Sequence, residues 1–94
     1  MNIKLIRTIA NQLIIGKVIE NEKTVIIQEP YDVFPTQEGI KMFPLDSAII
    51  GKDLEFAEIY KLNTIYVVEP AETLKNAYIE ALSPIENPTK QLII

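Results

Sequence analysis

Residues 13–28 read LIIGKVIENEKTVIIQ, and this stretch decides the fold. It holds two runs rich in β-branched residues, 13–19 and 24–28, and such residues favour the pleated surface of a sheet. The polar segment 20–23 between the two runs is typical of a turn. Because strands joined by a short turn pair in antiparallel fashion, this stretch predicts a β-hairpin.

The segment before the hairpin predicts another strand. Side chains alternate along residues 3–8 with a period of two, and the polar break at 10–12 suits a turn. A helix over residues 3–10 is the alternative, but Leu5 and Ile9 would point away from its apolar face and no cap precedes it. The first third of the chain is therefore expected to be a meander of three strands.

Gly16 lies in the middle of the second predicted strand. A glycine at such a position usually marks a bend or the close approach of another part of the chain. We interpret Gly16 as the kink that lets a long strand curl around a small barrel.

Residues 30–53 are predicted to form an irregular excursion. Pro30 should end the third strand, because proline donates no hydrogen bond to the ladder. Prolines and glycines punctuate the rest of the segment, yet apolar side chains recur in it, so we expect it to be ordered. Two alternatives stay open here: residues 32–34 can prolong the third strand, and residues 40–43 can form a short strand.

Strand character returns at residue 54. The side chains of residues 54–60 again alternate with a period of two. Residues 61–63 make a tight connector, and residues 64–68 are apolar on both faces. A strand without a polar face is usually covered on both sides. We therefore expect the following helix or a neighbouring subunit to cover residues 64–68.

A helix over about residues 70–82 is predicted next. Pro70 suits a first turn, and Glu72 suits the positive end of the helix dipole. One apolar stripe follows the helical period: Leu74, Ala77, Tyr78, Ala81 and Leu82. The tail, residues 83–94, ends in three apolar residues. Three alternatives stay open for them, since they can join a sheet edge, dock on a neighbouring subunit or fray.

The bulk composition is that of one domain spanning residues 1–94. Hydrophobic residues make up 48% of this short chain, and we expect part of that apolar surface to form a subunit interface. The absence of cysteine excludes disulfide bonds and favours a cytoplasmic location. No apolar run approaches the ~20 residues that span a bilayer, so we expect no membrane partner.

The usual equipment of catalysis is missing from the sequence. Without histidine or cysteine, the common nucleophilic sets and the usual zinc, copper and haem sites are excluded. The three glycines are too scattered for a phosphate-binding loop. Acidic residues gather at 20–22 and 53–58, and we interpret them as solvated side chains rather than as a hydrolase or calcium site. We therefore expect no enzyme activity, no cofactor and no metal.

The net charge of −4 gives the whole molecule no attraction for nucleic acid, so an RNA contact needs a local site. Lys61 and Asn63, in the tight connector, are candidate RNA-binding residues, because an ammonium group can contact a phosphate and an amide a base edge. An ordinary polar turn is the alternative. Tyr31, Phe34 and Tyr66 can stack on bases, although we expect at least two of them to be buried.

Two patterns in the chain resemble motifs of the Sm-like family. The first combines Gly16 in the second strand, Glu22 in the turn and the triplet VII at 25–27. The second is residues 59–67, IYKLNTIYV, in which two apolar strands flank a short turn that ends in asparagine. Together the patterns place the resemblance in the strands and leave the 30–53 excursion outside it.

The resemblance implies a small, strongly bent, five-stranded antiparallel barrel whose edge strands pair between subunits. The implied function is a homo-oligomeric ring that binds single-stranded RNA. The chain departs from the family pattern, since Ile26 replaces a base-reading asparagine, Lys61 and Leu62 replace arginine and glycine, and the helix is C-terminal. It resembles a divergent, phage-type member. A structural or protein–protein interaction module on the same barrel is the alternative function.

Overall fold

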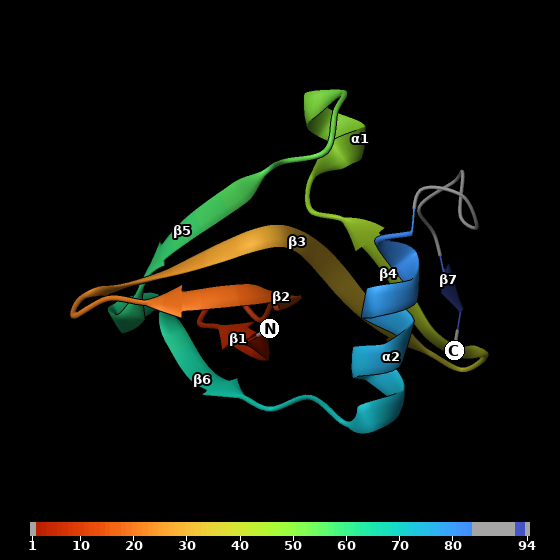
Figure 1. The fold of residues 1–94 in the computed structure, drawn as a ribbon, viewed down its shortest axis with the longest axis horizontal. Coiled ribbons are helices and arrows are strands. Elements are labelled where there is room, and N and C mark those ends of the chain that lie inside the picture. Colours follow the sequence, from red (N-terminus) through yellow and green to blue (C-terminus); the bar gives the residue numbers. More distant parts are fainter. Residues whose placement is uncertain (1, 84–91, 94) are drawn as a thin grey trace.

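The computed structural model describes residues 2–83 and 92–93 (Figure 1). Its strands are β1 (Ile3–Thr8), β2 (Leu13–Glu20), β3 (Thr24–Thr36), β4 (Gly39–Pro44), β5 (Phe56–Tyr60), β6 (Thr64–Val68) and β7 (Leu92–Ile93). Its helical elements are α1 (Ser47–Ile50), α2 (Glu72–Ala81) and the 3-10 turn η1 (Lys61–Asn63).

The strands form one antiparallel sheet. Within the described residues the strand order is β6-β1-β2-β3-β4-β7, and β5 pairs with β3 off this path. Besides β2, β3 is long enough to hold two further partners, with β5 along residues 24–28 and β4 along residues 31–36. The predicted mainly β class with a C-terminal helix is confirmed. All five predicted strands are present, and the sheet also contains β4 and β7.

Pro30 does not end the third strand, contrary to the prediction. β3 continues to residue 36 through a β-bulge. The bulge is seen as a shift in the register of β3 against β2 between Ile15 and Lys17. Glu29 adopts a left-handed conformation with φ 50°. A bulge leaves one residue outside the ladder, so a proline without an N–H group is tolerated there. The carbonyl of Pro30 still accepts a hydrogen bond from the amide of Leu45 at 2.9 Å.

Gly16 faces this bulge from β2. A Cβ atom at Gly16 would overlap Cγ2 of Ile27 and lie 3.0 Å from the carbonyl oxygen of Gln28. Of the two usual meanings of a mid-strand glycine, the structure thus shows the close approach at Gly16, whereas the extra residue that breaks the register belongs to β3 and not to the strand whose kink was assigned to Gly16.

Buried side chains form two clusters on opposite faces of the sheet. Adjacent residues of a strand point to opposite faces, and the neighbours Ile14 and Ile15 accordingly belong to different clusters. The inner cluster comprises Ile6, Ile14, Val18, Val25, Ile27 and Leu45, with side chains of β5 and β6 packed against it. The helix cluster comprises Ile3, Ile15, Tyr31, Val33, Met42, Leu74, Ala77, Tyr78 and Ala81. The curved sheet thus encloses one core and packs α2 over the other (Figure 1).

The predicted helix is present as α2, beginning two residues after the buried Pro70. Its buried residues are Leu74, Ala77, Tyr78 and Ala81, as the apolar stripe predicted. Leu82 follows the helix and packs against the same cluster. Within the described residues, no helix is long and apolar enough to cross a membrane.

The excursion is mostly regular structure. Both open alternatives hold, since residues 32–34 belong to β3 and residues 40–43 to β4. The short α1 follows, with left-handed residues at both ends, and its Ile49 is 87% exposed. In the tail, β7 joins the edge of β4, which confirms the sheet-edge alternative for residues 92–93. The prediction for the rest of the tail falls on residues 84–91 and 94, which lie outside the described residues.

Candidate nucleic-acid interface

The turn η1, which holds both predicted site residues, is fixed by backbone contacts on two sides. The amide of Lys61 donates to the carbonyl oxygen of Lys23, in the β2–β3 turn, at 2.8 Å. The carbonyl oxygen of Asn63 accepts from the amide of Ile9, beside the β1–β2 turn, at 2.8 Å. The hydroxyl of Thr64 donates to the carbonyl oxygen of Lys61 at 2.8 Å. η1 is therefore a rigid platform between two turns of the sheet.

A hollow of about 530 Å³ lies beside this platform. Its walls are Glu22, Lys23, Tyr60, Lys61 and Leu62. Tyr60 is 63% exposed and Leu62 is 89% exposed, so an aromatic ring and an aliphatic side chain are open to solvent between two lysines. The volume falls within the ~300–1,000 Å³ that is usual for small-ligand pockets, enough for one base and its sugar.

The structure brings the two predicted residues to the same turn but gives them different surroundings. Lys61 lines the hollow, whereas Asn63 is exposed next to it and is not part of the lining. Sequence reasoning missed Lys23 and Tyr60. Tyr60 pairs with Thr24 across β5 and β3, and this register is what brings the β2–β3 turn against η1. No local sequence pattern predicts the contact between β3 and β5, because the two strands are far apart in the chain.

This arrangement suits a single-stranded nucleic acid. An exposed aromatic ring offers a stacking face to a base. Two lysines at its edges offer ammonium groups to the flanking phosphates. The carboxylate of Glu22 lies on the same rim, so the local positive charge is small. In such a contact, stacking would supply a larger share of the affinity than charge would.

The other candidate stacking residues are divided between core and surface. Tyr31 is 3% exposed, and burial, followed by the charges of Asp53 and Glu29, raises its pKa to about 12. Phe34 and Tyr66 are exposed, at 48% and 37%. The expectation that at least two of the three are buried is wrong. Phe34 escapes burial because it lies near the end of β3, where its ring packs against Phe43 instead.

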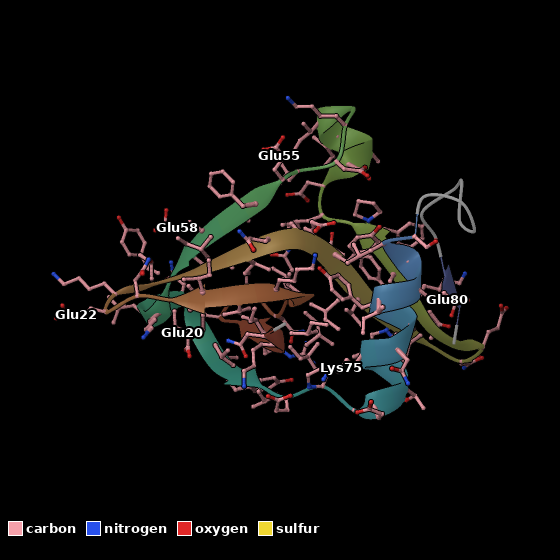
Figure 2. The ribbon with its side chains drawn as sticks, viewed as in Figure 1. Glu20, Glu22, Glu55, Glu58, Lys75 and Glu80 are labelled. Atoms are coloured by element: carbon pink, nitrogen blue, oxygen red, sulfur yellow. The ribbon has the colours of Figure 1, made fainter. Side chains whose placement is uncertain are left out.

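The acidic residues lie where the sequence predicted, on solvated surfaces. Figure 2 shows Glu20 and Glu22 near the tip of the β2–β3 hairpin, with Glu55 and Glu58 beside β5. All four are exposed, and Glu58 accepts a hydrogen bond from the Thr24 hydroxyl at 2.8 Å. Among the described residues, no three acidic side chains are grouped in a way that could hold a metal ion.

The strands on either side of η1 each use one edge only. Within the described residues β5 pairs with β3 alone, and β6 pairs with β1 alone. Large apolar side chains are exposed on both strands: Phe56 and Tyr60 on β5, and Ile65, Tyr66 and Val68 on β6. Unpaired edges that carry apolar side chains are prone to pair with another chain.

Comparison with known proteins adds no family. Neither the scan against protein-family models nor the search of curated proteins found a match for this chain. The resemblance to the Sm-like family therefore stays a prediction from the two sequence patterns, and functional inference starts from the geometry around η1.

Proposed function

We propose that the protein is a non-enzymatic, Sm-like subunit of a homo-oligomeric ring that binds single-stranded RNA. The observation that carries this proposal is the β5–η1–β6 unit. It combines two strand edges that have no partner within residues 2–83 and 92–93 with a hollow where an exposed aromatic ring lies beside Lys61 and, from the β2–β3 turn, Lys23. Assembly and RNA binding then both depend on residues 56–68, and Lys23 of the β2–β3 turn completes the hollow.

The exposure of β6 supports assembly. Its sequence, apolar on both faces, predicted a cover from the helix or from a neighbouring subunit. α2 packs against the helix cluster, which contains no residue of β6, so the helix does not supply that cover. Ile65 and Tyr66 are adjacent residues on opposite faces, and both are exposed. A second copy that adds its β5 edge to β6 covers both and closes a ring when repeated.

RNA binding rests on the hollow beside η1. A chain with a net charge of −4 does not attract RNA from a distance. A ring would place one copy of Tyr60, Lys23 and Lys61 in every subunit, and several weak contacts along one strand add up through effective concentration. The family's base-reading asparagine is replaced by Ile26, so the proposal includes no uridine preference.

A titration with a fluorescent ten-nucleotide oligouridine, followed by anisotropy at several salt concentrations, tests RNA binding. Affinity should fall as salt rises, because phosphate contacts release counterions. Lys61→Glu should weaken binding and reduce the slope of log affinity against log salt by about 0.7 for each lost contact. Lys52→Glu makes the same charge change at an exposed residue outside the hollow and should bind like the wild type.

The alternative is a structural or protein–protein interaction module on the same barrel. The acidic charge and the exposed Ile49 of α1 favour it. A protein that assembles but shows no RNA binding at low salt would support this alternative and contradict the RNA proposal. A strict monomer in native mass spectrometry would contradict the ring.

A further inference from the structure

The face of the sheet that carries α2 is covered along only part of its length. Ile15 of β2 and Tyr31 of β3 lie on this face and belong to the helix cluster. The same face continues toward the β2–β3 turn with Ile19 and its cross-strand partner Ile26, and neither belongs to that cluster. α2 therefore leaves the part of this face nearer the β2–β3 turn uncovered (Figure 1).

β5 widens the uncovered part by one strand. Phe56 pairs with Gln28 and Glu58 pairs with Ile26, so both side chains lie on the same face as Ile26. Phe56 is 58% exposed and Ile19 is 49% exposed. Apolar side chains thus lie together on three neighbouring strands, β2, β3 and β5, without a cover from the described part of the chain.

A hollow of about 740 Å³ is lined by these apolar side chains, and its rim is acidic. The carboxylates come from Glu29, in the β3 bulge, and from Asp53 and Glu55, in the segment before β5. None of the described residues that line it is basic. We call it the acidic groove. It is larger than the η1 hollow and opposite in charge, since two lysines line that hollow.

The negative charge of the acidic groove is only partly neutralised. Nζ of Lys17 lies 2.7 Å from Oε1 of Glu29, so this carboxylate is paired. Glu55 is exposed and forms no ion pair with another described residue. Burial raises the pKa of Tyr31 to about 12, and the charges of Asp53 and Glu29 contribute to that rise, so their field extends into the protein. The rim therefore favours a cation.

An apolar floor and an acidic rim together select a narrow class of partner. The rim repels the phosphate groups of nucleic acid and of anionic lipid. A wholly apolar ligand would remove carboxylates from water without pairing them, which costs free energy. Arginine next to aliphatic residues satisfies both parts of the groove. Its guanidinium group can stack on the ring of Phe56 and pair with Glu55, while the aliphatic side chains cover Ile19.

The shape of the acidic groove favours a segment of another protein. Ile19 and Phe56 stay about half exposed, so the groove is open along the strands, whereas a small-ligand pocket buries most of its ligand. A symmetric dimer through this surface is disfavoured, because the groove would then face itself and bring like charges together.

We propose that the acidic groove binds a segment of a partner protein in which arginine residues stand next to aliphatic ones. Arginine pairs with Glu55 and stacks on Phe56, and the aliphatic side chains cover Ile19 and Ile26. The inference goes beyond RNA binding and ring formation. The groove shares no lining residue with the η1 hollow, and it lies on a face of β5, whereas the proposed ring uses an edge.

The direct test is a titration of the full-length protein into a short fluorescent peptide in which arginine and leucine alternate, followed by anisotropy. Glutamate replaces arginine in one control peptide, and serine replaces leucine in the other. The arginine–leucine peptide should bind most tightly and should lose affinity as salt rises. In the ¹⁵N-labelled protein it should shift the amide signals of Ile19, Ile26 and Phe56. Equal binding of either control peptide, or shifts centred on Lys61, would overturn the proposal.

Two pairs of variants sharpen the test, and all four positions are exposed, so the variants should stay folded. Glu55→Gln should weaken binding of the arginine–leucine peptide about threefold, as expected for one exposed charge pair. Glu38→Gln removes the same charge in the β3–β4 turn and should bind like the wild type. Ile19→Gln should weaken binding about fivefold through lost apolar burial, whereas Ile79→Gln makes the same change on α2 and should not. Equal losses within either pair would contradict the assignment.

Native mass spectrometry tests the other occupant with a suitable charge, a second copy that enters through the lysines beside its η1. Glu55→Lys should leave the mass of the wild-type assembly unchanged. A lower mass would assign the groove to a contact between copies and overturn the proposal. The RNA result is independent: if the arginine–leucine peptide binds as expected while oligouridine does not bind, the η1 proposal fails and the groove assignment stands.

Discussion

The hydroxyl of Tyr78, on α2, donates a hydrogen bond to the backbone carbonyl of Glu29 at 2.9 Å, and lies 3.3 Å from that of Gln28. Glu29 is the left-handed residue of the β3 bulge. A bulge removes carbonyl groups from the ladder, and buried carbonyl groups need other partners. Tyr78 supplies one, and so the helix and the bend in the sheet stabilise each other.

Removal of this hydroxyl should therefore destabilise the fold. Tyr78→Phe keeps the ring, whose centroid is 5.6 Å from that of Tyr31 in an edge-to-face pair, and removes only the hydrogen bond. We expect a loss of about 1 kcal/mol in the free energy of unfolding, measured by urea denaturation. The matched control is Tyr60→Phe, since Tyr60 is exposed, and it should unfold like the wild type. Equal midpoints for Tyr78→Phe and the wild type would contradict this role.

The close approach at Gly16 gives a second prediction. Gly16→Ala should cost about 1–3 kcal/mol, because the new methyl group overlaps Cγ2 of Ile27. Ile27→Ala removes that atom, so the two substitutions together should destabilise by less than the sum of their separate effects. Ile27→Val keeps the γ carbons and should combine with Gly16→Ala almost additively. Chemical denaturation of the single and double variants measures the coupling, and additivity in both pairs would show that the contact is not the cause.

The predictable part of the fold was the part with local signals. The β-branched runs, the turn at residues 20–23 and the helical stripe are each contained in a short window, and all of them were found. The error at Pro30 has a different origin. The rule that a proline ends a strand holds for a regular ladder. Pro30 lies at a bulge instead, and that bulge depends on the register of β3 against Ile15 and Lys17, which is a non-local property.

The candidate site shows the same limit. Lys61 and Asn63 were singled out because the tight turn between two strands is visible in the sequence, although only Lys61 lines the hollow. Lys23 and Tyr60 were missed because the pairing of β3 with β5 brings them to the same hollow. The hydrogen bond between Gln12 and Asp32 was missed for a similar reason, since the two residues are 20 positions apart in the sequence. Sequence patterns predict single strands and helices well. A site formed by the pairing of distant strands can be predicted only when the register between those strands is known.

Asp32 predicts a dependence of stability on pH. Burial raises the pKa of its carboxyl group, and the charge of Asp46 adds to this rise. Hydrogen bonds from Gln12 and from the backbone of Asp46 lower the pKa but do not cancel the effect of burial. The folded-state pKa thus lies above the ordinary 3.8, so the stability contributed by the protonated form is complete below pH 3.8 and is lost as the pH rises through the folded-state pKa. Asp32→Asn has no carboxyl group to ionise and avoids this loss.

The Tm of Asp32→Asn should therefore rise relative to that of the wild type as the pH increases from about 3 to about 7. Scanning calorimetry of both proteins across this range measures the difference. The acidic residue Glu20 is exposed at the hairpin, and Glu20→Gln serves as the control with the same type of change. A difference in Tm between Asp32→Asn and the wild type that is flat or falls with pH would contradict the burial of the charge.

Two exposed isoleucines allow a matched test of the ring. Ile65 lies on β6, which among the described residues pairs along one edge only, and is 62% exposed, while Ile49 lies on α1 and is 87% exposed. Ile65→Glu places a charge in the proposed interface and should shift the mass in native mass spectrometry and light scattering from an oligomer to a monomer. Ile49→Glu makes the same chemical change outside the edge strands and should keep the oligomer. Because neither side chain is buried in the subunit, both variants should stay folded, as far-ultraviolet circular dichroism can verify. An Ile65→Glu protein with the mass of the wild-type oligomer would exclude β6 from the interface.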